Sequence, residues 1–332
     1  MRKTLKIIFP FLFGAAILGW MYRGFPLDKI ENTLCDGMNW GWIAASLFFG
    51  VVPQVVRGLR WHQALEPLDE HPLRRHCVEA VFLSFAASLL VPRIGEITRC
   101  GTLKKTDGTS FTKALGTVVT ERVVDTLLVL LIVGSVFLWQ LPIFLRFFST
   151  TGTNWESSVG RFTTTGYVVT LVCLVCAMAL VAFMVWKLNA FNKLRGGFLK
   201  LWEGINSLRN IRQPGLYVFY TLVIWLCYFL HFYLAFFAFN FTSELGLGIG
   251  LVAFCMITMA VLVPTPNGAG PWHFAVKTIL VLYGVGASEA ILFALIVHTL
   301  QTLLLVVLGV YAMFVLPNTK KSFFRNSTNN LI

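Results

Sequence analysis

Apolar runs of close to 20 residues recur along the chain, and they restrict it to a membrane fold. A helix needs about 20 mostly apolar residues to cross the hydrocarbon core of a bilayer. The 332 residues are 57% hydrophobic and only 13% charged, whereas soluble domains carry about 25% charged residues. We therefore predict an all-α polytopic membrane protein, with no soluble domain large enough to catalyse a reaction on its own.

The apolar segments predict about six full spans and two re-entrant or broken helix pairs. A short apolar segment interrupted by Pro and Gly is typical of a hairpin that turns back inside the membrane. The first segment follows basic residues but lacks a small-residue cleavage site, which favours an uncleaved span over a signal peptide. The predicted full spans are 5–22, 40–57, 114–141, 166–188, 214–240 and 287–316. The broken pairs are 77–105, with Pro92 and Gly95 as helix-breaking residues, and 248–285, with Pro264, Gly268 and Gly270.

Positive charge alternates from one connection between spans to the next. Most of the 27 lysines and arginines, including Arg57 and Arg60, fall on one side of this predicted topology. Because cytosolic loops carry the excess of Lys and Arg, we expect cytosolic N- and C-termini in a plasma membrane of the bacterial inner-membrane type. The net charge of +12 therefore predicts contacts with anionic lipid headgroups at the cytosolic face, and not with nucleic acid.

The two broken pairs repeat along the chain. A shift of 172 residues places Leu90-Val91-Pro92 on Leu262-Val263-Pro264 and Lys105 on Lys277. On the predicted topology the halves are inverted, as in many transporters, whose substrate sites lie at broken helices near the midplane. We predict a first half over 1–165, a second half over 166–317 and a basic cytosolic tail over 318–332. The alternative is that apolar sequences align without a common origin.

Span 114–141 carries three charged residues, Glu121, Arg122 and Asp125. Each charge at membrane depth costs about 2.5–3.5 kcal/mol on insertion scales, so each needs a compensating role. Glu121 and Asp125 are four apart and share a helix face, whereas Arg122 and Asp125, three apart, can pair. One interpretation is an internal ion pair that holds helices together. The other is the charged wall of a polar cavity.

The broken pairs supply the remaining candidate residues. Arg93, Glu96 and Arg99 would line one face of a helix that restarts after Pro92, and a helix N-terminus and guanidinium groups both suit a phosphate. In the second pair and the last span, we expect four side chains to converge on the same cavity. These are Asn267, His273, Lys277 and His298. His231 is expected to be a packing or hydrogen-bonding residue.

No sequence feature predicts a cofactor or a metal ion. Cys173 and Cys176 have a CxxC spacing without a second pair of ligands, and a tetrahedral zinc site needs four. The Walker A, HExxH, GxSxG and Rossmann signatures are not found in the sequence, which disfavours an ATP-driven pump or a conventional hydrolase.

Four motifs resemble those of the lysylphosphatidylglycerol synthase transmembrane-region family of flippase-like membrane proteins. They are Leu-Val-Pro-Arg-Ile-Gly-Glu-Ile-Thr-Arg (90–99), Glu121-Arg122-x-x-Asp125, Arg57-x-x-Arg60-Trp61 and Val-Pro-Thr-Pro-Asn-Gly-Ala-Gly (263–270). The resemblance covers nearly the whole chain, without the soluble aminoacyl-transferase domain of some members. Many members place a Glu after the second glycine run, where this chain has Trp272-His273.

The resemblance implies translocation of a lipid between leaflets. The expected substrate is a membrane phospholipid or a polyprenyl-linked lipid, whose phosphate would meet Arg93 and Arg99. Glu96, Glu121 and Asp125 would meet a cationic group or balance the arginines. The alternative is a membrane-embedded transferase that acts on a lipid-linked donor with an acidic residue as base. The sequence favours the transporter.

Overall fold

The computed structural model describes residues 38–91, 94–140, 211–263 and 265–329, together with positions 19 and 33. The described residues form helices and contain no β-strand, apart from one isolated bridge between Met38 and Phe239. Four helical stretches are long and apolar enough to span a membrane, which agrees with an integral membrane protein. These are Trp40–Leu68, Phe111–Trp139, Pro214–Ala238 and Ala287–Leu316.

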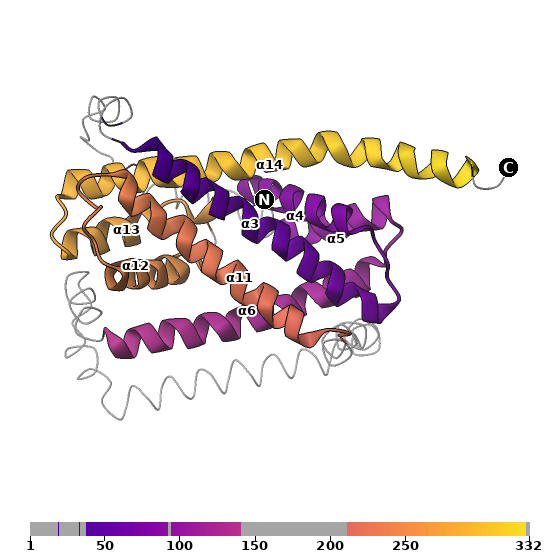
Figure 1. The fold of residues 1–332 in the computed structure, drawn as a ribbon, viewed down its shortest axis with the longest axis horizontal. Coiled ribbons are helices and arrows are strands. Elements are labelled where there is room, and N and C mark those ends of the chain that lie inside the picture. Colours follow the sequence, from indigo (N-terminus) through magenta and orange to yellow (C-terminus); the bar gives the residue numbers. More distant parts are fainter. Residues whose placement is uncertain are drawn as a thin grey trace, which may run out of the picture.

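Two helices that run side by side occupy the middle of the molecule. Helix α3 (Trp40–Leu65) packs along α11 (Pro214–Tyr233), and both lie diagonally between α6 (Phe111–Trp139) and α14 (Ala287–Asn329) (Figure 1). The Asn39 side chain caps α3 by accepting from the Gly41 N–H at 3.0 Å. His231 joins the two central helices, because its Nδ1–H donates to the Ser46 carbonyl at 2.6 Å. The predicted hydrogen-bonding role of His231 is confirmed.

The first hairpin consists of α4 (Arg74–Leu90) and α5 (Ile94–Thr106), which pack against each other. Gly95 lies inside α5, so the prediction that it breaks the helix is wrong. A Cβ at Gly95 would overlap the Ser84 carbonyl oxygen and the Ser88 hydroxyl. This glycine therefore allows the two helices of the hairpin to approach closely.

The open end of the first hairpin is closed by Asp107. Its carboxylate accepts from His76 Nδ1 at 2.8 Å, from the Leu73 N–H at 3.3 Å and from the Thr106 hydroxyl at 2.6 Å. The hydrogen bond to Asp107 raises the pKa of His76 above its ordinary value, against the opposing effect of burial. Burial opposes ionisation of Asp107, but the hydrogen bonds from His76 and Thr106 prevail and lower its pKa.

The second hairpin consists of α12 (Leu247–Ala260) and α13 (Pro271–Leu282), joined through the short 3-10 helix η4 (Pro266–Gly268). Asn267, Gly268 and Gly270 have φ values of 50°, 71° and 93°. Glycine adopts these left-handed conformations without the steric cost of a Cβ, so the prediction that Gly268 and Gly270 interrupt the helices is consistent with the structure. Pro92 and Pro264, the other predicted helix breakers, lie outside the described residues.

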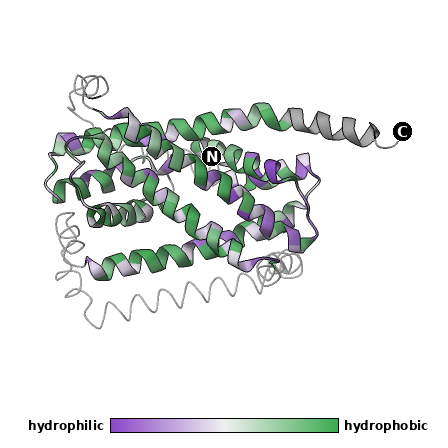
Figure 2. Cartoon of the chain, in the orientation of Figure 1, coloured by the Kyte–Doolittle hydropathy of each residue, from purple (hydrophilic) through white to green (hydrophobic). Residues whose placement is uncertain are grey.

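Helix α14 contacts both hairpins. It packs along α4, where a Cβ at Gly309 would overlap the Ala86 side chain, and along α13. Figure 2 shows that hydrophobic residues dominate the helices, while hydrophilic residues gather where α3 ends and the first hairpin opens. Helix α14 continues to Asn329 and so includes the start of the predicted tail over 318–332.

The helix bounds change one prediction that matters for function. The sequence suggested that the second span ends at residue 57 and that Arg57 and Arg60 lie in a loop. Helix α3 instead continues to Leu65 and carries both arginines, which are 3% and 0% exposed. The predicted span 166–188 lies outside the described residues, and so does the predicted span 5–22 apart from position 19.

Candidate functional site

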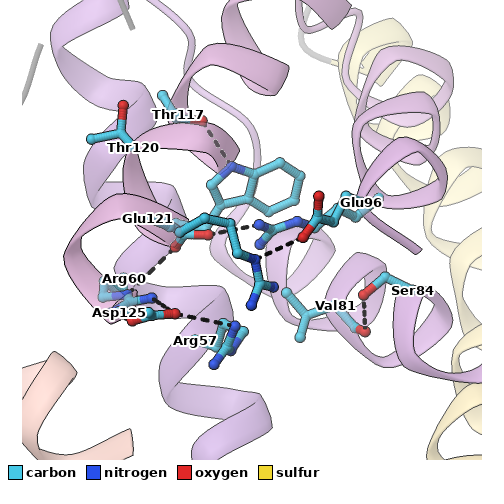
Figure 3. A network of polar contacts seen from close by, with 12 residues as sticks. Arg57, Arg60, Val81, Ser84, Glu96, Thr117, Thr120, Glu121 and Asp125 are labelled. Atoms are coloured by element: carbon cyan, nitrogen blue, oxygen red, sulfur yellow. Dashed lines mark hydrogen bonds and ion pairs between the residues drawn. The ribbon is translucent and has the colours of Figure 1, made fainter. Parts of the chain in front are cut away.

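A buried cluster of arginines and carboxylates joins α3, α5, α6 and α11 (Figure 3). At its centre, Arg60 holds Asp125 with two hydrogen bonds, from Nη1 to Oδ1 at 2.8 Å and from Nη2 to Oδ2 at 3.2 Å. Arg60 Nη1 also donates to the Thr221 hydroxyl at 2.9 Å. The two planar groups therefore meet in the fork-like arrangement that gives strong, charge-assisted hydrogen bonds.

A second buried pair ties the first hairpin to α6. Arg99 Nη2 donates to Glu121 Oε2 at 2.8 Å, and the Arg99 guanidinium lies 4.7 Å from the centre of the Trp61 ring. The Trp61 indole N–H in turn donates to the Thr117 hydroxyl at 2.9 Å. Arg99 is 1% exposed. Arg99 therefore joins the first hairpin to α6 through Glu121 and to α3 through Trp61.

The rim of the cluster is formed by Arg122 and Glu96. Arg122 Nε lies 2.7 Å from Glu96 Oε1, and the two side chains are 45% and 39% exposed. Arg122 does not pair with Asp125, so that sequence prediction is wrong. The reason is that Asp125 faces α3, where two arginines are available, whereas Arg122 points toward α5. The prediction that Glu121 and Asp125 share a face is confirmed, because both approach Arg60.

Arg57 differs from the other arginines of the cluster. Its Nη1 lies 3.5 Å from Asp125 Oδ2, beyond a good hydrogen-bond distance, and its Nε and Nη1 have no hydrogen-bond partner. Its guanidinium carbon lies 5.8 Å from the ring centres of both Phe85 and Tyr228. A buried guanidinium with unused donors is expensive unless an acceptor reaches it. Arg57 therefore has two buried N–H donors with which it can bind an anion.

The cluster carries more positive than negative charge. Its four arginines are Arg57, Arg60, Arg99 and Arg122, and its three carboxylates are Glu96, Glu121 and Asp125. Unused donors remain on three of these arginines, and one unused acceptor remains on Glu121. The cluster therefore contains one more guanidinium group than carboxylates.

A separate polar cluster lies at the tip of the second hairpin. The rings of His273 and His298 are 4.4 Å apart between centres, and the side chains of Asn267 and Thr302 are joined by a hydrogen bond of 2.7 Å. His298 Nε2 lies 3.1 Å from the Asn267 carbonyl oxygen. The structure therefore brings Asn267, His273 and His298 together. Lys277 lies one turn beyond His273 on α13 and is half-buried.

The structure thus divides the predicted site residues into two clusters on different sets of helices. Glu96, Arg99, Glu121, Arg122 and Asp125 belong to the arginine cluster; Asn267, His273 and His298 belong to the second. Arg93 lies outside the described residues. Sequence reasoning missed Arg57 and Arg60 as site residues, although the Arg57-x-x-Arg60 spacing continues the helical period of the span before it. Within the described ranges, no three His, Cys, Asp or Glu side chains are placed to share a metal ion.

The chain matches one protein-family model over most of its length. The family model described as "Lysylphosphatidylglycerol synthase TM region" matches residues 7–309, a range that contains both hairpins and the arginine cluster. No curated protein and no solved structure shows a significant match to the chain.

Proposed function

Because the chain belongs to the lysylphosphatidylglycerol synthase transmembrane-region family, with a membrane lipid-related role, we propose that it moves a phosphate-bearing lipid between leaflets. The observation that carries the proposal is Arg57, a buried guanidinium in a membrane span with donors left unused. Phosphate oxygens are the acceptors that a guanidinium binds best. The lipid is a membrane phospholipid or a polyprenyl-linked lipid.

The rim gives the headgroup a route to Arg57. Arg122 and Glu96 are partly exposed, so a phosphate arriving from the membrane surface can displace Glu96 from Arg122. It then moves inward to Arg57, whose Nε and Nη1 donors are not engaged by another acceptor. Arg60 stays paired with Asp125 and Arg99 with Glu121, and these two pairs keep the helices around the site in place. The acyl chains remain in the surrounding lipid, where their burial costs nothing.

Transport requires that part of the protein moves to open the site, and we assign this movement to a hairpin. In this proposal the halves 1–165 and 166–317 form an inverted repeat, and the site opens by movement of the first hairpin, which carries Glu96 and Arg99. The N-terminus is cytosolic in a bacterial inner membrane, and the cytosolic face contacts anionic headgroups. An impermeant thiol reagent added outside should therefore label a cysteine at Asn240 and not one at Lys104; the reverse would refute this orientation.

A transferase is the alternative, and it would need a carboxylate free to act as base. Each of the three carboxylates of the cluster already has an arginine within 2.8 Å. This pairing supports transport over group transfer. The two functions differ in one observable, because transport leaves the mass of the lipid unchanged.

The test uses the purified chain in liposomes that contain fluorescent phosphatidylglycerol. We expect the labelled lipid to change leaflets, as measured by its access to an external quencher, with no new mass in the lipid extract. Arg57→Gln should weaken lipid binding about tenfold or more, since a charge-assisted hydrogen bond contributes about 1.5–3 kcal/mol and about 1.4 kcal/mol corresponds to a factor of ten. Arg75→Gln, which changes an exposed arginine of α4, is the matched control. Equal binding by both variants would refute the role of Arg57, and a lipid of altered mass would favour the transferase.

A further inference from the structure

Gln54, one turn before Arg57 on α3, is a buried glutamine whose side chain makes a single hydrogen bond. The two residues are three apart and share a helix face, and each is 3% exposed. Gln54 Nε2 donates to the Tyr228 hydroxyl of α11 at 3.3 Å. Among the described residues, Gln54 Oε1 has no hydrogen-bond partner. A buried polar atom without a partner is costly, so this oxygen favours a ligand that supplies one.

Gln54 and Arg57 meet at the same aromatic side chain. The Arg57 guanidinium carbon lies 5.8 Å from the centre of the Tyr228 ring, and the hydroxyl of that ring accepts the Gln54 hydrogen bond. The unused donors of Arg57 and the unused acceptor of Gln54 therefore lie around one tyrosine. A guanidinium suits a phosphate, whereas a neutral amide suits a neutral polar group. The pair therefore matches a phosphate that carries a polar substituent.

The other glutamine of α3, Gln63, has a different neighbour. Gln63 is 7% exposed, its Nε2 donates at 2.9 Å to the backbone carbonyl that precedes α11, and its Oε1 is also unpartnered within the described ranges. The arginine one turn before it is Arg60, which holds Asp125 with two hydrogen bonds. Gln63 lies about 13 Å along the helix from Gln54, so it provides a matched control on the same helix.

A hydroxyl is the substituent that fits the Gln54 amide best. The amide end that is unused in the structure is an acceptor, and a half-turn of the carboxamide would present an N–H donor in its place. Because a hydroxyl both donates and accepts, it can bond Gln54 in either orientation. An ammonium group only donates, and the positive charge of the neighbouring Arg57 would repel it.

We propose that Gln54 is a specificity-determining residue that selects lipids whose phosphate carries a hydroxylated headgroup, such as a glycerol or a sugar. The inference rests on the proposed lipid transport and deepens it, because Arg57 binds the phosphate and Gln54 bonds a hydroxyl next to it. Phe85 of α4 has its ring centre 5.8 Å from the Arg57 guanidinium carbon. Movement of the first hairpin, which includes α4, would take this ring away and make room for the phosphate.

The first measurement compares two lipids on the unchanged protein. Phosphatidylglycerol and phosphatidylpropanol have the same charge and the same carbon skeleton in the headgroup, but only phosphatidylglycerol carries hydroxyls. Each lipid displaces fluorescent phosphatidylglycerol from the purified chain in detergent micelles. We expect phosphatidylglycerol to bind about three- to tenfold more tightly, which is the effect of one hydrogen bond of typical strength. Equal affinity for the two lipids, with both still weakened by Arg57→Gln, would overturn the role of Gln54 and leave the proposed function intact.

Substitutions at Gln54 separate its role from that of Arg57. Gln54→Leu should lower the affinity for phosphatidylglycerol to that for phosphatidylpropanol, whose own affinity should stay the same. Gln63→Leu is the matched control and should keep the preference. Gln54→Glu should form an ion pair with Arg57 and weaken the binding of both lipids, as Arg57→Gln does.

Two outcomes for Gln54→Leu would overturn the proposal. One is an unchanged preference for phosphatidylglycerol. The other is an equal loss of both lipids, because it would mean that Gln54 supports the site as a whole and does not recognise a hydroxyl. If the unchanged chain binds neither lipid, the proposed function itself is overturned.

Discussion

Removing the charge of Asp125 tests the assignment of partners within the arginine cluster. Asp125 accepts two hydrogen bonds from Arg60, which is fully buried. Asp125→Asn removes the carboxylate that Arg60 hydrogen-bonds and leaves Glu121, 3.5 Å from Arg60 Nε, as its remaining acidic neighbour. Breaking a buried ion pair from one side costs about 3–5 kcal/mol. We expect a loss of that size in the free energy of unfolding, measured by tryptophan fluorescence during titration with SDS in mixed micelles.

The double variants decide which arginine is the partner. Asp125→Asn combined with Arg60→Gln should be more stable than the sum of the single changes predicts, with an interaction energy of about 1–3 kcal/mol. Asp125→Asn combined with Arg122→Gln is the matched control, because Arg122 pairs with Glu96. Neighbours three apart on one helix contribute about 0.2–0.5 kcal/mol. A larger interaction energy with Arg122 than with Arg60 would refute the arrangement described above.

Two further predictions concern the first hairpin. The raised pKa of His76 means that its contribution to stability is complete below pH 6.5 and is lost as the pH rises through its folded-state pKa; the melting temperature should therefore fall across that window, and His76→Gln, which removes the pair with Asp107, should not show the same fall. Gly95→Ala should destabilise the protein because its Cβ would overlap the Ser84 carbonyl oxygen, whereas Gly101→Ala on the same helix meets nothing within 4 Å and should be neutral or stabilising by up to about 1 kcal/mol. Equal melting temperatures for the two alanine variants would contradict the close approach within the hairpin.

The sequence predicts the membrane class and the approximate position of each described helix, because apolar length and Pro/Gly interruptions are properties of single segments. It does not predict which helix supplies the partner of a charge. Arg122 is the nearest cation to Asp125 along the chain, but Arg60, 65 residues away, is the one that binds it. The basic Arg57-x-x-Arg60 run also mimics the end of a span, and only packing against α6 and α11 reveals that the helix continues through it.

Helix α14 is one continuous helix that contacts both hairpins. His298 and Thr302 hold η4 of the second hairpin, and Gly309 meets Ala86 of the first. These contacts lie 7 to 11 residues apart, about 10–16 Å along an uninterrupted helix. A displacement at the tip of the second hairpin would therefore reach the first hairpin, which carries Glu96 and Arg99 of the arginine cluster, through one continuous helix.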